Sequence, residues 1–93
     1  MKIDQVLEHL ERAAATLAIA VTYEPLQSAT GFGGLCRVRG EYRVIIDKRA
    51  TTSERVTTLA KALSRMGAET LPLPAEVRDV IGSVGARATR QAS

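Results

Sequence analysis

Side chains that commonly act in catalysis are sparse in this chain and do not form a set. His9 is the only histidine and Cys36 the only cysteine among the 93 residues, and the acidic residues are scattered. A nucleophilic site needs a base beside its nucleophile, and a zinc site needs several imidazole or thiolate ligands. We therefore interpret His9 as a surface residue of a helix and Cys36 as a small core residue of a strand. The sequence predicts no catalytic residues, no metal and no cofactor.

Arginine and lysine side chains offer a different chemistry, which is the binding of anions. The candidates for contact with phosphates or carboxylates are Arg37, Arg39, Arg43, Lys48, Arg49, Lys61 and Arg65. The net charge is only +3, with 13 basic residues interspersed among 10 acidic ones, and three aromatic residues leave few platforms for stacking bases. A weakly basic nucleic-acid-binding protein is therefore our alternative hypothesis, and arginines that protect a sheet edge are the simpler explanation.

The stretch from residue 41 to 67 combines a strand, a capped turn and a helix. The β-branched run 44–46 predicts a strand covered on both faces, which we place at the centre of the sheet. Thr51 lies three residues before Glu54, the spacing of a capping box, so a helix is expected to begin near Thr52 and to stop at Gly67. The apolar stripe of this helix consists of Val56, Leu59, Ala60, Leu63 and Met66.

This stretch resembles the core of ImmA/IrrE-type zinc metallopeptidases, in which a strand of the form I-I-V-N precedes an S-x-E-R turn and a helix reading T-L-A-H-E-L-G-H. Here the strand ends in VIID, the turn contains SER, and the matching helix positions are Thr58, Leu59, Ala60 and Leu63. Lys61, Ala62 and Arg65 occupy the places of the first histidine, the catalytic glutamate and the second histidine. Two cations at ligand positions would repel a metal, so the resemblance implies a zincin-like fold without the metal or the activity.

The remaining elements follow from periodicity and from glycine and proline. Apolar residues at helical spacing predict a helix from Ile3 to Leu17, and alternation predicts a strand over residues 19–23, ended by Pro25. Residues 35–47 are interpreted as an antiparallel hairpin, and Pro74 as the first residue of a short helix that ends near Val84. The order helix, strand, strand, strand, helix, helix predicts a small α+β domain over residues 1–84. Its three-stranded, mostly antiparallel sheet is flanked by helices, and a disordered tail follows over residues 85–93.

With no catalytic set, we expect a non-catalytic protein-protein interaction or regulatory module. The partner is another protein, with a second copy of the chain as one candidate. The candidate partner-binding residues are Phe32, Leu35, Arg37 and Arg39. Phe32 lies at the tip of a glycine-rich loop, and Leu35 points away from the face that holds Cys36, so either a helix or a partner must cover Leu35.

A cytoplasmic protein is expected from the cysteine count and the N-terminus. One cysteine cannot form an internal disulfide, which favours a reducing compartment. The N-terminal residues include acidic side chains where a secretory signal needs an apolar run. No segment approaches the roughly eighteen apolar residues of a membrane span, so no membrane partner is expected.

Overall fold

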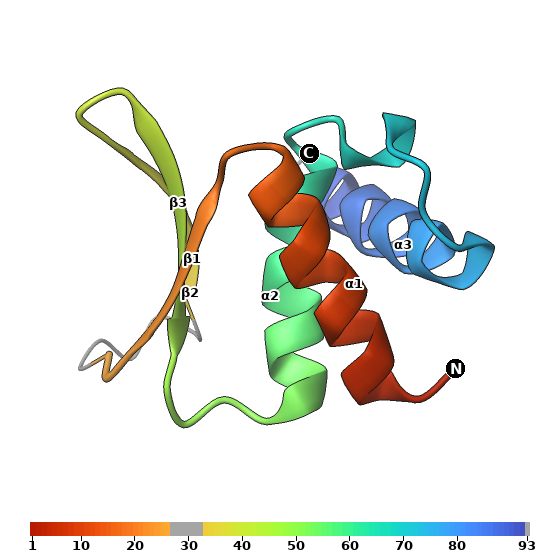
Figure 1. The fold of residues 1–93 in the computed structure, drawn as a ribbon, viewed down its shortest axis with the longest axis horizontal. Coiled ribbons are helices and arrows are strands. Elements are labelled where there is room, and N and C mark those ends of the chain that lie inside the picture. The colour runs from red at the N-terminus through yellow and green to blue at the C-terminus, as the bar shows by residue number, and fades with distance from the viewer. Residues whose placement is uncertain (27–32, 93) are drawn as a thin grey trace.

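The computed structural model describes residues 1–26 and 33–92, with the side chains of residues 69 and 86–92 excepted. Along the chain its elements are α1 (Ile3–Thr16), β1 (Ala20–Glu24), β2 (Gly33–Val38), β3 (Glu41–Asp47), α2 (Thr52–Ser64), a 3-10 turn η1 (Ala68–Thr70) and α3 (Ala75–Ala92). This order confirms the predicted α+β class (Figure 1).

The three strands form a mixed sheet in the order β1-β3-β2. The strand β3 lies in the centre, as predicted, and its neighbours are β2 in an antiparallel pair and β1 in a parallel pair. The expectation of a mostly antiparallel sheet was therefore wrong for one of the two pairs. The tight turn between β2 and β3 makes this pair antiparallel, whereas β1 runs in the same direction as β3.

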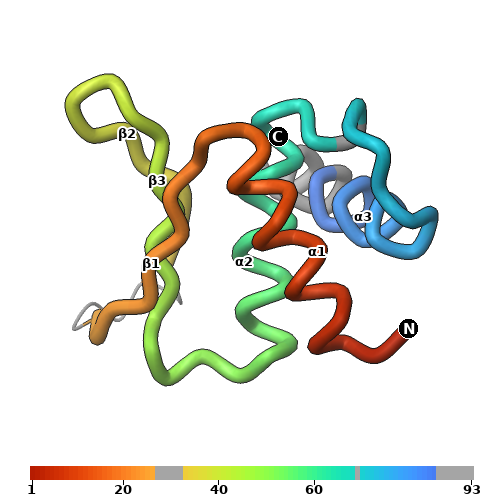
Figure 2. The backbone as a smooth tube through the Cα atoms, in the orientation of Figure 1, coloured from red at the N-terminus to blue at the C-terminus, as the bar shows by residue number. Residues whose placement is uncertain are grey.

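All helices of the described chain lie on one side of the sheet. Figures 1 and 2 show the sheet as one layer, α1 and α2 against one of its faces, and α3 packed on the far side of these two helices. The prediction of a central strand covered on both faces was therefore wrong. Val44 and Ile46 are fully buried beneath the helices, whereas Ile45 points to the opposite face and is only half-buried.

Local signals explain where α2 begins and which side of it is buried. The Thr51 hydroxyl accepts a hydrogen bond from the Glu54 backbone N–H at 3.2 Å, and the Glu54 carboxylate accepts one from the Thr51 N–H at 2.8 Å. This is the predicted capping box, which satisfies two N–H groups that have no partner within the helix. Leu59 and Leu63 are fully buried, so the predicted apolar stripe faces the core.

The last helix is longer than the sequence pattern indicated. We expected a short helix followed by a tail from Gly85, but α3 runs from Ala75 to Ala92. Gly85 lies close to the end of α2, since a Cβ at this position would stand 2.8 Å from the Ser64 Cβ. The absence of apolar residues after Gly85 suggested a tail, yet alanine, arginine and glutamine all have high helix propensity.

Candidate protein-binding surface

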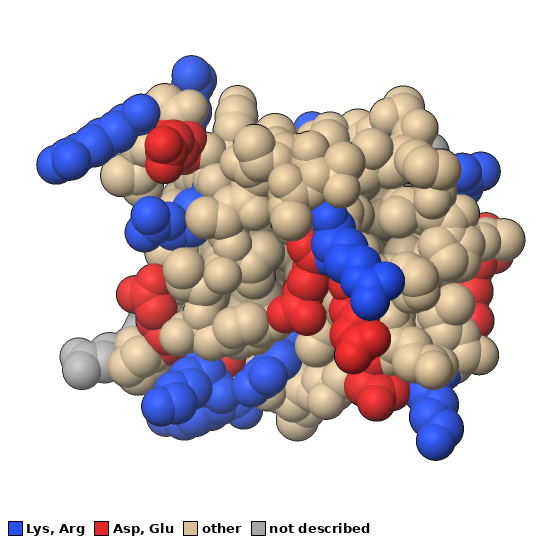
Figure 3. All heavy atoms as spheres, viewed as in Figure 1, with Lys and Arg blue, Asp and Glu red and all other residues tan. Residues whose placement is uncertain are grey.

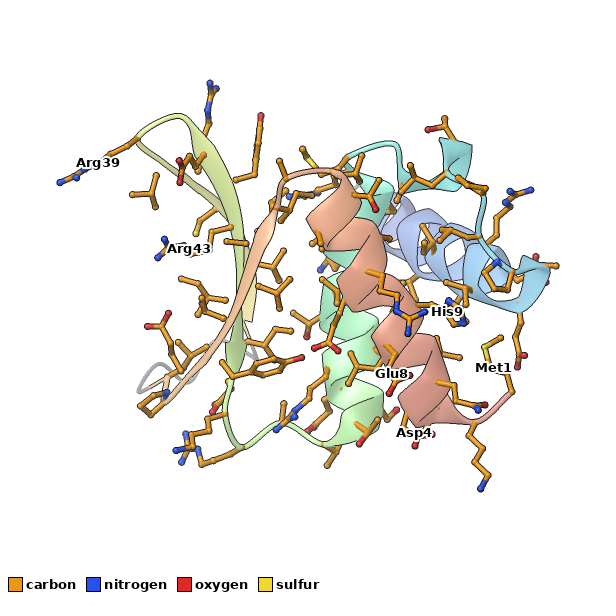
Figure 4. All side chains as sticks on the ribbon, in the orientation of Figure 1. Met1, Asp4, Glu8, His9, Arg39 and Arg43 are labelled. Carbon is orange, nitrogen blue, oxygen red and sulfur yellow. The ribbon has the colours of Figure 1, made fainter. Side chains whose placement is uncertain are left out.

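A two-residue turn joins β2 and β3 into a hairpin whose tip extends past the helices (Figure 1). Arg39 and Gly40 form this turn, with φ values of 54° and 82°. Two successive residues in the left-handed conformation match the right-handed twist of the strands. This conformation is strained for Arg39, which has a Cβ atom, but not for Gly40. Figure 4 shows Arg39 at the tip and Arg43 on β3, with both side chains directed away from the helices.

The start of β2 requires a glycine. Gly33 has a φ of 125°, and a Cβ built there would stand 1.7 Å from the Ile45 carbonyl oxygen of β3. Both the conformation and the close approach of the two backbones exclude a larger residue. Gly33 therefore allows β2 to reach its register along β3.

The face of the sheet opposite the helices is formed by alternate residues of the three strands. Pairing aligns Thr22 with Ile45, and it aligns Arg43 with Ala20 on one side and with Cys36 on the other. We call this surface the open face, and its residues are Ala20, Thr22, Glu24, Cys36, Val38, Glu41, Arg43 and Ile45. Val38 is 47% exposed, whereas Cys36, Arg43 and Ile45 are half-buried by their neighbours. The neighbours of Arg43 on this face are thus small or apolar side chains and Glu41.

Leu35, one of the predicted partner-binding residues, does not lie on this surface. Leu35 aligns with Val44 and packs against the core, so a helix rather than a partner covers it. Cys36, which we predicted to be a core residue, is on the open face instead, because adjacent residues of a strand point to opposite faces. Phe32 lies outside the described residues.

The two predicted arginines of the hairpin differ in their surroundings. Arg37 is on the helix-side face of β2, beyond the cover of the helices, and its guanidinium carbon lies 5.4 Å from the centre of the Tyr42 ring. Arg39 is exposed at the turn, without a hydrogen bond or ion pair in the described chain. Arg39 and Arg43 are therefore the two predicted binding residues that can contact a partner on the side of the open face.

The predicted anion-binding residues do not form one continuous strip. Figure 3 shows Lys and Arg side chains at the hairpin end and again at the opposite end of the sheet. At that opposite end Arg49 is already occupied, since its Nη2 atom donates to the Leu26 carbonyl at 3.0 Å and contacts the Asp47 carboxylate at 3.4 Å. Lys48 is exposed beside it, and Lys61 and Arg65 are exposed at the C-terminal half of α2.

Asp47 organises the end of β3 that carries these residues. Its carboxylate is buried and accepts a hydrogen bond from the Arg49 backbone N–H at 3.0 Å. This hydrogen bond, together with the Arg49 guanidinium, lowers the pKa of Asp47 below its usual value, although burial opposes the effect. The carboxylate and Arg49 therefore stabilise the turn into α2, and the two charges are not free for a ligand.

A polar cluster that the sequence did not reveal joins α1, β1 and α2. The Tyr23 hydroxyl donates to the Glu11 carboxylate at 2.5 Å, and the Arg55 guanidinium carbon lies 4.7 Å from the centre of the Tyr23 ring. Burial, and then the adjacent Glu11, raise the pKa of Tyr23 to about 12. Arg55 also donates to the carbonyls of Ala50 and Lys48. A tyrosine with such a high pKa keeps its proton at neutral pH and is a poor acid catalyst. The contacts of the cluster instead stabilise the packing of the sheet on the helices.

The positions that the sequence resemblance aligns with a zinc motif are divided between the surface and the core. Ala62 is buried, whereas Lys61 and Arg65 are exposed. Across the residues that the structure describes, no three His, Cys, Asp or Glu side chains lie close enough together to hold a metal ion. Within the same residues, no helix has the length and apolar character needed to cross a bilayer.

The open face is the feature of this structure that most directly indicates a function. Within residues 1–26 and 33–92, no element covers this face of the sheet (Figure 1), apolar side chains lie on it, and its two arginines form no ion pair. The chain was compared with protein-family models, curated proteins and solved structures, and none of them matches it.

Proposed function

We propose that this protein is a non-catalytic protein-binding module, and that its partner docks on the open face of the sheet. The observation that carries the proposal is the position of Ile45. A central strand with one face in water normally alternates apolar and polar residues, yet Ile45 lies on the side without helices. An apolar face that no helix covers is typical of a surface buried by another molecule.

The neighbours of Ile45 support the same interpretation. Cys36 and Val38 continue the apolar surface along β2, and Ala20 and Thr22 add small side chains from β1. A partner that covers these residues gains roughly 25 cal/mol for each Å² of apolar surface removed from water. The sheet also leaves the outer edges of β1 and β2 beside this face, where an extended segment can pair with exposed N–H and C=O groups.

The resemblance to zinc metallopeptidases fits this proposal as a metal-free relative of a zincin-like fold. Lys61 and Arg65 stand where that resemblance places metal ligands, and neither side chain can bind a cation while it is charged. The proposed module works in a reducing cytoplasm, through contact rather than chemistry.

Nucleic acid is the second candidate, because Arg39 and Arg43 are free to contact phosphates. Binding to duplex nucleic acid generally uses several cations at once. Arg49 is engaged with Leu26 and Asp47, so the cations at the far end of the sheet contribute less than their number indicates. The apolar part of the open face also has no role in contact with phosphates.

Site-specific photocrosslinking of the full chain in its native cell tests the docking surface. A photoreactive residue in place of Val38 should form a crosslink to one defined protein, because this side chain is exposed on the open face. The matched control carries the same residue at Thr57, which is exposed on α2. Equal crosslinking to that protein from both positions would contradict the proposal, and crosslinks to nucleic acid from Val38 would favour the second candidate.

A further inference from the structure

We infer that the segment that docks on the open face is acidic, and that Arg39 and Arg43 bind its carboxylates while its apolar residues pack on Val38 and Ile45. This inference rests on the proposed function and adds the chemistry of the partner. Three observations support it: the free charges of the hairpin, the partial burial of Arg43, and the apolar side chains of Val38 and Ile45 near the two arginines.

The first step is the contrast between occupied and free arginines. Arg49, Arg55 and Arg78 each donate a hydrogen bond to a backbone carbonyl within the described chain. Arg39 and Arg43 have neither a hydrogen bond nor an ion pair there. The occupied arginines stabilise loops and helix ends, whereas Arg39 and Arg43 are free and lie beside the open face. Arg12 and Arg65 also lack such a bond in the described chain, but they lie on α1 and at the end of α2, away from the open face.

The second step is the position of Arg43. It stands between Ala20 and Cys36 in the middle of the open face and is half-buried, although no carboxylate of the described residues forms an ion pair with it. Partial burial removes some of the water around this guanidinium, and no hydrogen bond or ion pair within the described chain compensates for the loss. An incoming carboxylate can accept two parallel hydrogen bonds from such a group, and this geometry is a strong form of ion pairing.

The apolar side chains near the two arginines favour a polypeptide over a nucleic acid as the partner. Val38 directly precedes Arg39, and Ile45 lies two residues from Arg43 on the same face, so apolar and cationic groups alternate over short distances. A phosphate backbone offers no apolar group to Val38 or Ile45. The aromatic ring of this hairpin, Tyr42, lies on the helix-side face beneath Arg37 and is not placed to stack on a base over the open face. An extended segment with acidic and apolar residues satisfies both kinds of contact.

Glu41 limits which acidic segments fit. This residue shares the face of Arg43 near the hairpin turn and, in the described chain, forms no ion pair with either arginine. A carboxylate placed beside Glu41 would be repelled, whereas one placed toward Ala20 or beyond the tip at Arg39 would not. We therefore expect acidic residues of the partner to be spaced rather than contiguous.

Fluorescence anisotropy with labelled synthetic peptides tests the inference. The probe is a short peptide with spaced glutamates among valine and serine, and its matched control has glutamine in place of every glutamate. The full-length chain should bind the acidic peptide, bind it less tightly as salt rises, and bind the glutamine peptide at least about tenfold more weakly. A duplex DNA of mixed sequence is titrated in parallel.

Two double variants locate the binding. R39Q with R43Q should weaken binding of the acidic peptide by about tenfold or more, whereas K61Q with R65Q removes the same charge from α2 and should leave it within about twofold. All four residues are polar and outside the core, so both variants should keep the thermal melting curve of the wild type.

Three results would overturn the inference: no binding of the acidic peptide, equal loss in both double variants, or tighter binding of the DNA. Equal loss would indicate attraction to net charge alone. The Val38 crosslink reports on the docking surface whatever the partner's chemistry is. Failure of the peptide with a successful crosslink would refute only the acidic partner, and failure of both would refute the docking surface as well.

Discussion

Two adjacent isoleucines of β3 provide a direct test of the one-sided sheet. Ile46 is fully buried beneath the helices, and Ile45 is half-buried on the open face. Replacing either one by alanine removes the same three carbon atoms from the same strand. The loss of β propensity is therefore the same in both variants. The difference between their free energies of unfolding measures how much more deeply one side chain is buried than the other.

The expected difference follows from burial. Removing three buried carbons costs about 2.4 kcal/mol in transfer free energy, at roughly 0.8 kcal/mol for each group, and the cavity left behind adds to this. Ile46→Ala should therefore lower the free energy of unfolding by about 3–5 kcal/mol. Ile45→Ala loses about half of the transfer term and leaves no closed cavity, so about 1–2 kcal/mol is expected including strand propensity.

Urea unfolding followed by circular dichroism measures both values, and thermal melting provides a second measurement. In a domain of this size 1 kcal/mol corresponds to about 4–8 °C, so the two melting temperatures should differ by at least roughly 4 °C. Equal losses in the two variants would mean that Ile45 is as well covered as Ile46. The open face, and both proposals built on it, would then be incorrect.

Other expectations concern the core, the start of β2 and the tyrosine cluster. Leu63→Ala should cost about 2–5 kcal/mol in urea unfolding because the side chain is fully buried, whereas Lys61→Ala on the exposed side of α2 should change stability by less than about 0.5 kcal/mol. Gly33→Ala should disrupt the pairing of β2 with β3, seen as lost amide protection in hydrogen exchange, while Gly82→Ala, with open space around its Cβ position, should stabilise α3 by about 0.5–1 kcal/mol. The pKa of Tyr23 is raised from 10.0 to about 12, so the fold favours the protonated phenol: stability should be intact below pH 10 and fall as the pH rises from 10 to 12. In Tyr23→Phe this component of the alkaline loss should disappear, and an unchanged pH profile would contradict the link to Glu11.

Elements whose signals lie within a few residues could be predicted from the sequence. The capping box of Thr51 and Glu54 locates the start of α2, and the spacing of Leu59 and Leu63 identifies its buried side. The β-branched run of β3 likewise identifies the central strand. Each of these depends on local hydrogen bonding or on the period of one element, which the order of residues determines directly.

The length of α3 shows that hydrophobic periodicity does not locate the end of a helix. From the lack of large apolar residues after Gly85 we expected the helix to end near Val84, but α3 continues to Ala92. Helix propensity and a start that is anchored in the core carry a helix beyond its last buried residue, and hydrophobic periodicity does not report on either of them.

The candidate surface depended on tertiary structure. Alternation along β2 places Leu35 and Cys36 on opposite faces, but only the packing of the helices decides which of the two faces the core, and the sequence-based assignment was the reverse of the one observed. In the same way, the sequence does not show which of Arg43 and Arg49 has a partner. Arg49 is occupied in part because the fold brings the Leu26 carbonyl to it from 23 positions away, and Arg43 is free because no carboxylate of the described residues forms an ion pair with it. Short-range order fixes which residues share a face of an element, whereas the cover of that face and the pairing of a charge depend on segments that meet only when the chain is folded.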